Sequence, residues 1–160
     1  MTPITTPEID VVALTPDRAA ACEAVGRELP AWFGIEEGLQ ELRRCAETQE
    51  GFVAVHEDAV VGFVTLARHF PETWEITWMA VHPRWHRLGL GRRLVEAAVA
   101  RCRAARATTL LVKTLAGTHS SPEYAKSRAF YRAMGFRRLE VFPELWGPHT
   151  PCLLMARVIG

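Results

Sequence analysis

The sequence lacks the features that mark membrane, secreted and metal-binding proteins. No apolar run approaches the ~20 residues of a membrane span. Residues 1–4 have neither the basic nor the apolar region of a signal peptide. The four cysteines are far apart and form no C-x-x-C pair, so we expect free thiols and no metal site. These absences predict a cytoplasmic protein that does not act on a membrane.

Two common nucleotide-binding motifs are absent as well. Gly89 and Gly91 are two residues apart, but Leu94 takes the place of the third glycine in G-x-G-x-x-G. The chain also has no Gly-Lys-Ser or Gly-Lys-Thr, and therefore no P-loop. The sequence therefore predicts neither of these two modes of nucleotide binding.

Basic side chains are scarce in the first half of the chain, and acidic side chains are scarce in the second half. Residues 1–80 hold 14 acidic and 5 basic side chains, a net charge of −9. Residues 81–160 hold 4 acidic and 14 basic ones, a net charge of +10, and seven arginines lie within 84–106. This basic run is either a solvated helix face or a platform for an anion. No Cys/His finger and no aromatic RNP-like strand accompanies it, so we expect no nucleic-acid partner.

A length of 160 residues and an apolar content of 49% predict one domain over residues 1–160, with 1–8 as a loose tail. Alternating or apolar runs predict strands at 9–14, 52–56, 60–68, 74–81, 108–114, 136–142 and 152–158. Helix periodicity and capping signals predict helices at about 15–28, 36–47, 89–105 and 122–134. The sum is a mixed α/β sheet with an antiparallel front half.

The stretch from Val81 to Leu94 is the centre of this pattern. An apolar run ends at Val81, Pro83 prevents further strand pairing, and two glycines precede a helix. The free N–H groups and the dipole at a helix N-terminus suit a phosphate or pyrophosphate. The alternative is an ordinary strand-to-helix turn. Because strand, turn, helix and strand follow one another, 74–81 and 108–114 should be parallel neighbours.

Three motifs in this order resemble the GCN5-related N-acetyltransferase (GNAT) superfamily. They are Val81-His82-Pro83, then His86-x-x-Gly89-x-Gly91-x-x-Leu94, then Ala129-Phe130-Tyr131-x-x-x-Gly135-Phe136. The resemblance covers essentially the whole chain and is strongest over 74–136. It implies the GNAT-like acyl-CoA N-acyltransferase fold, with a splayed central pair of parallel strands. It also implies acetyl-coenzyme A as the donor and a primary amine as the usual acceptor.

The resemblance assigns the cofactor contacts to the turn, the preceding strand and the last helix. The pyrophosphate would lie on the turn formed by Arg87, Leu88, Gly89, Leu90, Gly91 and Arg92, with His86 where the family usually has Gln or Arg. The pantetheine arm would follow the strand ending in Met79, Ala80 and Val81, where a backbone N–H meets the thioester carbonyl. Tyr124, at the position of a family asparagine, Ser127 and Phe130 complete the expected contacts.

The same resemblance assigns two catalytic roles. Tyr131 matches the family's general acid, which protonates the departing thiolate, and its alternative is a core tyrosine. Glu75 matches the base glutamate of some relatives, and its alternative is an exposed or paired strand carboxylate. Strand alternation predicts Glu75, Thr77 and Met79 on one face, with Trp74, Ile76, Trp78 and Ala80 on the other.

The acceptor itself is not specified by the sequence. Its pocket is expected from Trp32, Phe33 and the segments 72–74 and 142–149, with His119, Ser120 and His149 as further candidates. A nucleophilic Cys152 is a weaker alternative, while His56, His69 and His82 are expected to be structural or exposed. The acceptor is thus a small-molecule or peptide amine. Transfer of another acyl group, a hydroxyl acceptor, a non-catalytic acyl-CoA sensor and a homodimer through the last strands all stay open.

Overall fold

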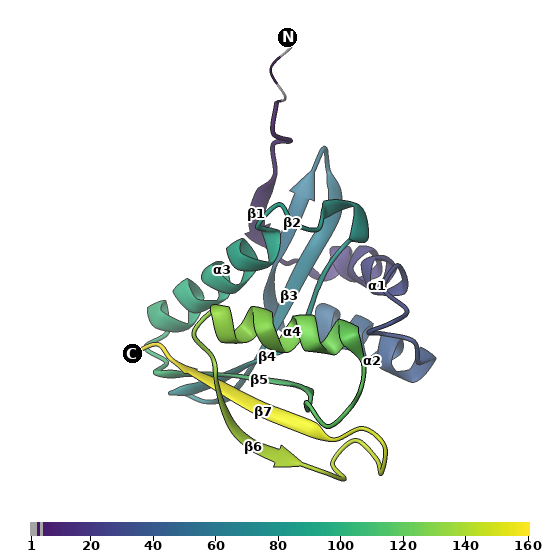
Figure 1. Ribbon diagram of the computed structural model, residues 1–160. Helices are drawn as coiled ribbons and strands as arrows, with labels where there is room; N and C mark the ends of the chain where they lie inside the picture. The colour runs from purple at the N-terminus through teal and green to yellow at the C-terminus, as the bar shows by residue number, and fades with distance from the viewer. Residues whose placement is uncertain (1–2, 4) are drawn as a thin grey trace.

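The computed structural model describes residues 3 and 5–160, and they form a seven-stranded mixed sheet with four α-helices (Figure 1). The strands lie in the order β1-β2-β3-β4-β5-β7-β6. All neighbours are antiparallel except β4 and β5, which are parallel. This confirms the predicted fold class. The tail expected over 1–8 includes Met1, Thr2 and Ile4, which lie outside the described residues.

The elements follow the predicted order closely. The strands are β1 (Asp10–Ala13), β2 (Glu50–His56), β3 (Ala59–Phe70), β4 (Thr73–Val81), β5 (Thr109–Leu115), β6 (Arg137–Phe142) and β7 (Cys152–Val158). The α-helices are α1 (Ala19–Arg27), α2 (Glu36–Thr48), α3 (Leu90–Ala104) and α4 (Pro122–Ala133). Two 3₁₀ turns, Pro16–Arg18 and Pro83–Trp85, precede α1 and α3.

Several boundaries differ from the prediction by one to three residues, including the start of the first helix and the end of β3. The first helix was expected to begin at Pro16, but Pro16–Arg18 is a 3₁₀ turn closed by the Arg18 N–H on the Thr15 carbonyl at 3.0 Å. Strand β3 extends to Phe70 rather than ending at Arg68, so the turn into β4 is shorter than expected. The extension places His69 within β3, beside the start of β4.

Helices cover both faces of the sheet. Leu94, Val95, Val99 and Cys102 of α3 pack with Trp74, Ile76, Leu110 and Val112 in one core cluster, which also includes Tyr131 of α4. The second cluster lies on the other face, where Cys22, Val25 and Leu42 of α1 and α2 meet Val53, Phe63 and Ala80. In Figure 1, α4 crosses in front of the strands. The described part of the chain contains no helix that could cross a membrane.

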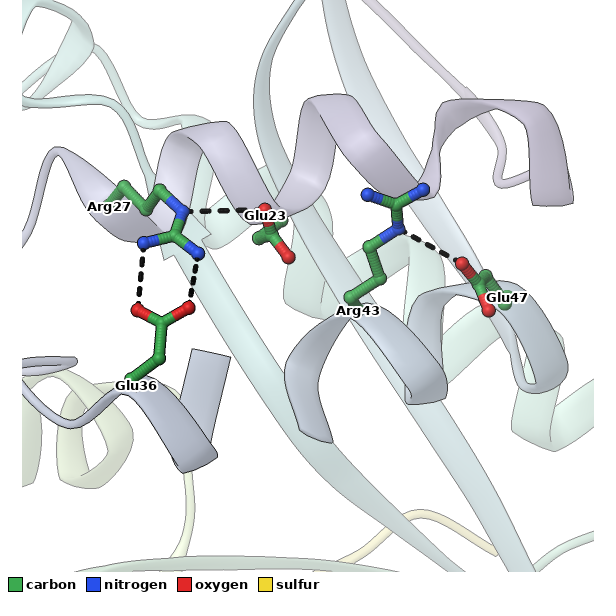
Figure 2. Close-up of polar contacts among 5 residues, drawn as sticks. All are labelled: Glu23, Arg27, Glu36, Arg43 and Glu47. Atoms are coloured by element: carbon green, nitrogen blue, oxygen red, sulfur yellow. Dashed lines mark hydrogen bonds and ion pairs between the residues drawn. The ribbon is translucent and has the colours of Figure 1, made fainter. Parts of the chain in front are cut away.

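An ion pair joins the two ends of the α1–α2 loop (residues 28–35). Arg27 at the end of α1 donates two hydrogen bonds to Glu36 at the start of α2, at 2.8 and 3.0 Å, and a third to Glu23 at 3.3 Å. Figure 2 shows this arrangement beside the separate Arg43–Glu47 pair within α2. The loop that carries Trp32 and Phe33 therefore begins and ends at a bidentate contact.

The parallel strands β4 and β5 pair only along their first halves. Their paired residues run from Thr73 with Thr109 to Ile76 with Val112, and beyond this point the two strands separate. On its other side, β4 stays paired with β3 up to Val81. The result is a gap between β4 and β5 beyond Ile76 and Val112, as the splayed pair in the predicted fold requires.

A bulge in β4 sits where the gap begins. Thr65 of β3 pairs with Trp78, but the next residue, Leu66, pairs with Ile76, so Thr77 is the extra residue. Its hydroxyl lies 2.8 Å from the Thr65 hydroxyl and donates to Gln49 Oε1 at 2.6 Å. These contacts stabilise the bulge and connect it to Gln49 at the end of α2.

The predicted alternation along 74–81 is wrong because of this bulge. Trp74 and Ile76 face the α3 and α4 side, and so does Met79, whereas Trp78 and Ala80 pack on the α1 and α2 side. One extra residue reverses the facing of every side chain after it. Glu75 and Met79 therefore lie on opposite faces.

Candidate active site

The turn between β4 and α3 presents free backbone N–H groups. Gly89 is the N-cap of α3 and has a left-handed backbone, with φ of 75°, and Arg87 has φ of 66°. The first helical bond runs from Arg93 N to Gly89 O at 3.1 Å. Within residues 3 and 5–160, no acceptor bonds the N–H groups of Leu90, Gly91 and Arg92. They are placed for an anion at the helix N-terminus.

The two glycines of this turn are needed for different physical reasons. Gly89 needs its positive φ, and a Cβ added there meets nothing within 4 Å. A Cβ on Gly91 would lie 3.2 Å from Cζ of Phe130 on α4. Gly89 thus permits the left-handed turn before α3, while Gly91 permits α3 and α4 to approach each other.

His86 contacts the strand rather than the turn. Its Nε2 lies 2.6 Å from the carbonyl of Val81, so the ring donates its N–H to the last residue of β4. This bond ties the start of the turn to the end of the strand. It orders the backbone that the sequence predicted for the cofactor.

A cavity of about 590 Å³ connects the turn, the end of β4 and α4. This volume is within the range of small-molecule sites. The lining residues include most of the predicted cofactor contacts: Met79, Ala80, Val81, His86, Arg87, Gly89, Leu90, Gly91, Arg92, Ser127 and Phe130. Leu88 and Tyr124 are not in the lining, while Tyr131 is.

Trp32 of the α1–α2 loop closes one side of this cavity. Its indole N–H donates to Ser127 Oγ at 3.0 Å, and its backbone carbonyl accepts from the Tyr124 hydroxyl at 2.8 Å. Phe33 packs on Trp78 with ring centroids 5.8 Å apart. The Tyr124 and Ser127 hydroxyls, expected to contact pantetheine, are therefore bonded to the α1–α2 loop. Trp32 and Phe33 line the cavity in addition to packing.

Tyr131 reaches the cavity from the core. Its ring makes edge contacts with Phe130 and Phe136, with centroids 5.3 and 5.5 Å away, and the residue is 8% exposed. Burial raises the pKa of its phenol well above the ordinary value, and nearby Tyr124 adds to the effect. The group is thus a packed core residue that keeps its proton at neutral pH.

Glu75 lies on the opposite face, in a small polar cluster. Its Oε1 is 2.7 Å from His69 Nε2 and 3.4 Å from Lys113 Nζ. The Glu75 side chain is 8% exposed, so it is a buried, paired carboxylate. We call Glu75, His69 and Lys113 the Glu75 cluster. It lies at the paired end of β4, before the gap.

Other candidates have structural roles or lie apart. Trp74 is 1% exposed and stacks with Arg101 at 5.3 Å, so it does not line an acceptor pocket. His119 accepts from the Ser121 N–H, and His82 accepts from the Arg84 N–H. His149 is exposed in the β6–β7 connection, and neither it nor Ser120 lines the cavity.

The comparisons with known proteins agree with this geometry. Residues 47–138, more than half of the chain, match the family described as "Acetyltransferase (GNAT) domain". The chain belongs to the GNAT family of acetyltransferases. No curated protein sequence gives a significant match.

Solved GNAT structures share the whole fold at low sequence identity. A GNAT-family protein from Desulfovibrio desulfuricans is 18% identical, with a TM-score of 0.84 over 96% of this chain and 100% of that one. The ribosomal-protein-S18-alanine N-acetyltransferase of Escherichia coli is 19% identical, with a TM-score of 0.76 over 96% and 95%. A Salmonella typhimurium structure with acetyl-CoA as its cofactor is 16% identical, with a TM-score of 0.73 over 96% and 95%.

The residues of this GNAT domain fit a bound coenzyme A in chemical type. The free N–H groups at the start of α3 suit a pyrophosphate, and the gap beside β4 leaves strand backbone exposed for an amide-bearing arm. The described residues contain no group of three or more His, Cys, Asp or Glu arranged for a metal.

Reasoning from the sequence missed three residues near this site. The sequence predicts Trp32 as an acceptor contact, but not as a hydrogen-bonding partner of α4. It places Lys113 within an expected strand and His69 among the structural or exposed histidines, and it does not predict their contacts with Glu75. The contacts of Trp32 and Lys113 span 95 and 38 residues. His69 meets Glu75, six residues away, only through the pairing of β3 with β4, so no local signal identifies any of the three.

Proposed function

We propose that this protein transfers the acetyl group of acetyl-coenzyme A to a primary amine by direct attack in a ternary complex. The observation that carries the proposal is the gap between β4 and β5, which opens beside the free N–H groups of α3. Family membership and neighbours named for N-acetyltransfer support the reaction class.

Residues on the two faces of the sheet carry out different parts of the reaction. Acetyl-coenzyme A supplies an activated acetyl thioester when bound. Met79, Ala80 and Val81 orient the arm, and an N–H near Ala80 or Val81 stabilises the carbonyl oxygen. Tyr131 donates its proton to the departing sulfur from the α4 side. Glu75 lies on the other face and provides general-base catalysis, through its own carboxylate or through a group hydrogen-bonded to it.

A base is needed because of the acceptor's charge. Neutral pH is about 3.4 units below the pKa of a lysine-type amine, so removing its proton at pH 7 costs roughly 4.6 kcal/mol. An α-amine costs only about one unit. The chain therefore has greater need of the Glu75 cluster if its acceptor is an alkyl amine than if it is a peptide N-terminus.

A non-catalytic acyl-CoA sensor is the alternative of a different class. The retained Tyr131 and Glu75 favour the enzyme, because a sensor needs neither an acid nor a base. Other acyl groups and hydroxyl acceptors remain variants of the same reaction.

The test combines binding and turnover. Calorimetry with acetyl-coenzyme A should show one site per chain, and Gly89→Ala should weaken binding because its φ of 75° disfavours a Cβ. Thiol release is then followed with an N-terminal alanine peptide, an aminoglycoside, spermidine and free amino acids. Release with at least one amine supports the enzyme. Tight binding without release from any of them would favour the sensor.

A further inference from the structure

His69 is the extra residue of a second bulge, at the end of β3. Arg68 pairs with Trp74 and Phe70 with Thr73, so His69 has no paired partner of its own on β4. Bulges redirect side chains and are common beside functional sites. Here the bulge residue is a titratable one, and its ring contacts Glu75.

The contact fixes which ring nitrogen carries the proton. Glu75 Oε1 lies 2.7 Å from His69 Nε2, and a carboxylate oxygen can only accept. Nε2 therefore carries the hydrogen, and Nδ1 of the neutral ring holds the free lone pair. Within the described residues, Nδ1 has no hydrogen-bond partner.

Exposure separates the two groups. The Glu75 side chain is 8% exposed and its Oε1 is shared with Lys113 Nζ at 3.4 Å, whereas His69 is 44% exposed. An acceptor amine on this face of the sheet meets the imidazole more readily than the carboxylate. Imidazoles in general titrate nearer to neutral pH than carboxyls, which suits a base at pH 7.

The titratable groups around His69 come from three strands. Glu75 on β4 and Lys113 on β5 contact the cluster directly, and Cys152 on β7 lies within electrostatic range of both. Arg68 turns to the other face, with its guanidinium 6.0 Å from the Trp74 ring. Glu75 is therefore the anion that stabilises a protonated imidazole, while Lys113 holds Glu75 in position.

We propose that His69 is the general base of the acetyl transfer, and that Glu75 and Lys113 are positioning residues for it. This inference rests on the proposed function and refines its base side. An N–H bond of the acceptor ammonium breaks, directly or through one water, and the proton goes to His69 Nδ1 while the electron pair stays on the amine nitrogen. The imidazolium pairs with Glu75 and later releases the proton to solvent.

The first test uses two substitutions with different structural effects. His69→Gln keeps an N–H donor for Glu75 but cannot accept the proton, and His69→Ala leaves room for free imidazole. Both should lower kcat/KM about 100-fold on the best amine of the panel. Added imidazole should restore at least a tenth of the wild-type rate to His69→Ala and leave His69→Gln unchanged. His149→Gln is the control, since His149 is exposed in the β6–β7 connection and does not line the cavity.

A second readout is independent of turnover. ¹⁵N NMR of the free protein should show that the neutral ring of His69 carries its hydrogen on Nε2, and Glu75→Gln should shift that tautomer population. Melting temperatures near the wild type exclude misfolding as the cause of lost activity.

The outcomes separate the two proposals. His69→Gln at the wild-type rate, with Glu75→Gln inactive, would overturn the role of His69 and leave the proposed function intact. A loss in His69→Ala that imidazole does not restore would also overturn it. If the wild type acetylates no amine, the proposed function fails and this inference fails with it.

Discussion

At the scale of single residues, Tyr131 combines packing and chemistry. Its ring is fixed between Phe130 and Phe136, and the residue lines the same cavity as Met79, Ala80 and Val81 at the end of β4. Tyr131→Phe should lower kcat about 100-fold, because the departing thiolate loses its proton donor. Affinity for coenzyme A should not change, since the ring stays in place.

The measurement is steady-state turnover together with calorimetry of coenzyme A. Because burial raises the pKa of the Tyr131 phenol, wild-type activity should not fall through loss of this proton below about pH 10. Unchanged turnover in Tyr131→Phe with intact coenzyme A binding would reject the acid role.

The same raised pKa makes a prediction for alkaline stability. In the unfolded chain a tyrosine loses its proton near pH 10, whereas the folded protein retains the proton of Tyr131. Stability that is fully present below pH 10 is therefore lost as the pH rises above it, by about 1 kcal/mol per pH unit. Urea unfolding between pH 8 and 11 should show this loss in the wild type and a smaller one in Tyr131→Phe. Equal slopes would contradict it.

At the scale of elements, the approach of α3 to α4 depends on Gly91. A Cβ there would lie 3.2 Å from the Phe130 ring. Gly91→Ala gains helix propensity but compresses this contact, so its effect should depend on the residue at 130. In a Phe130→Leu background the same change should be more favourable by about 1 kcal/mol. Urea unfolding of the four proteins measures the coupling, and additivity within ~0.3 kcal/mol would exclude it.

The α1–α2 loop joins the two halves of the site at the same scale. Its ends meet through Arg27 and Glu36, and its centre meets α4 through Trp32. A loop bonded at both ends and in the middle holds its aromatic residues in place at the cavity. The position of Trp32 is thus set by α4 as much as by its own segment.

At the scale of the whole molecule, all four thiols are buried in the core. Burial raises the pKa of Cys22 to about 12 and that of Cys102 to about 11, and it also raises those of Cys45 and Cys152. At pH 8 in the native state, iodoacetamide should react roughly 100-fold more slowly than with the urea-unfolded chain. Mass spectrometry of the labelled chain measures each site. Rapid labelling of Cys152 in the native state would revive it as a nucleophile.

How far the sequence predicts the site depends on how local each signal is. The glycine turn and Tyr131 follow from short motifs, because a φ of 75° at Gly89 and the helix end at Gly135 need particular residues. The residue at which β4 bulges, Thr77, and the second bulge at His69 depend on how β3 and β4 pair, so no short motif locates them. An error of one residue in this register was enough to reverse the expected facing of Trp78 and Ala80.

The order of strands and helices, the parallel pair and the anion-binding turn were fixed by the chain's own periodicity, glycines and proline. These features depend on neighbours a few residues away. Only the tertiary structure decided that Glu75 lies between His69 and Lys113, and that Trp32 reaches Ser127. Such contacts join segments separated by up to 95 residues, and strand register and helix packing set them.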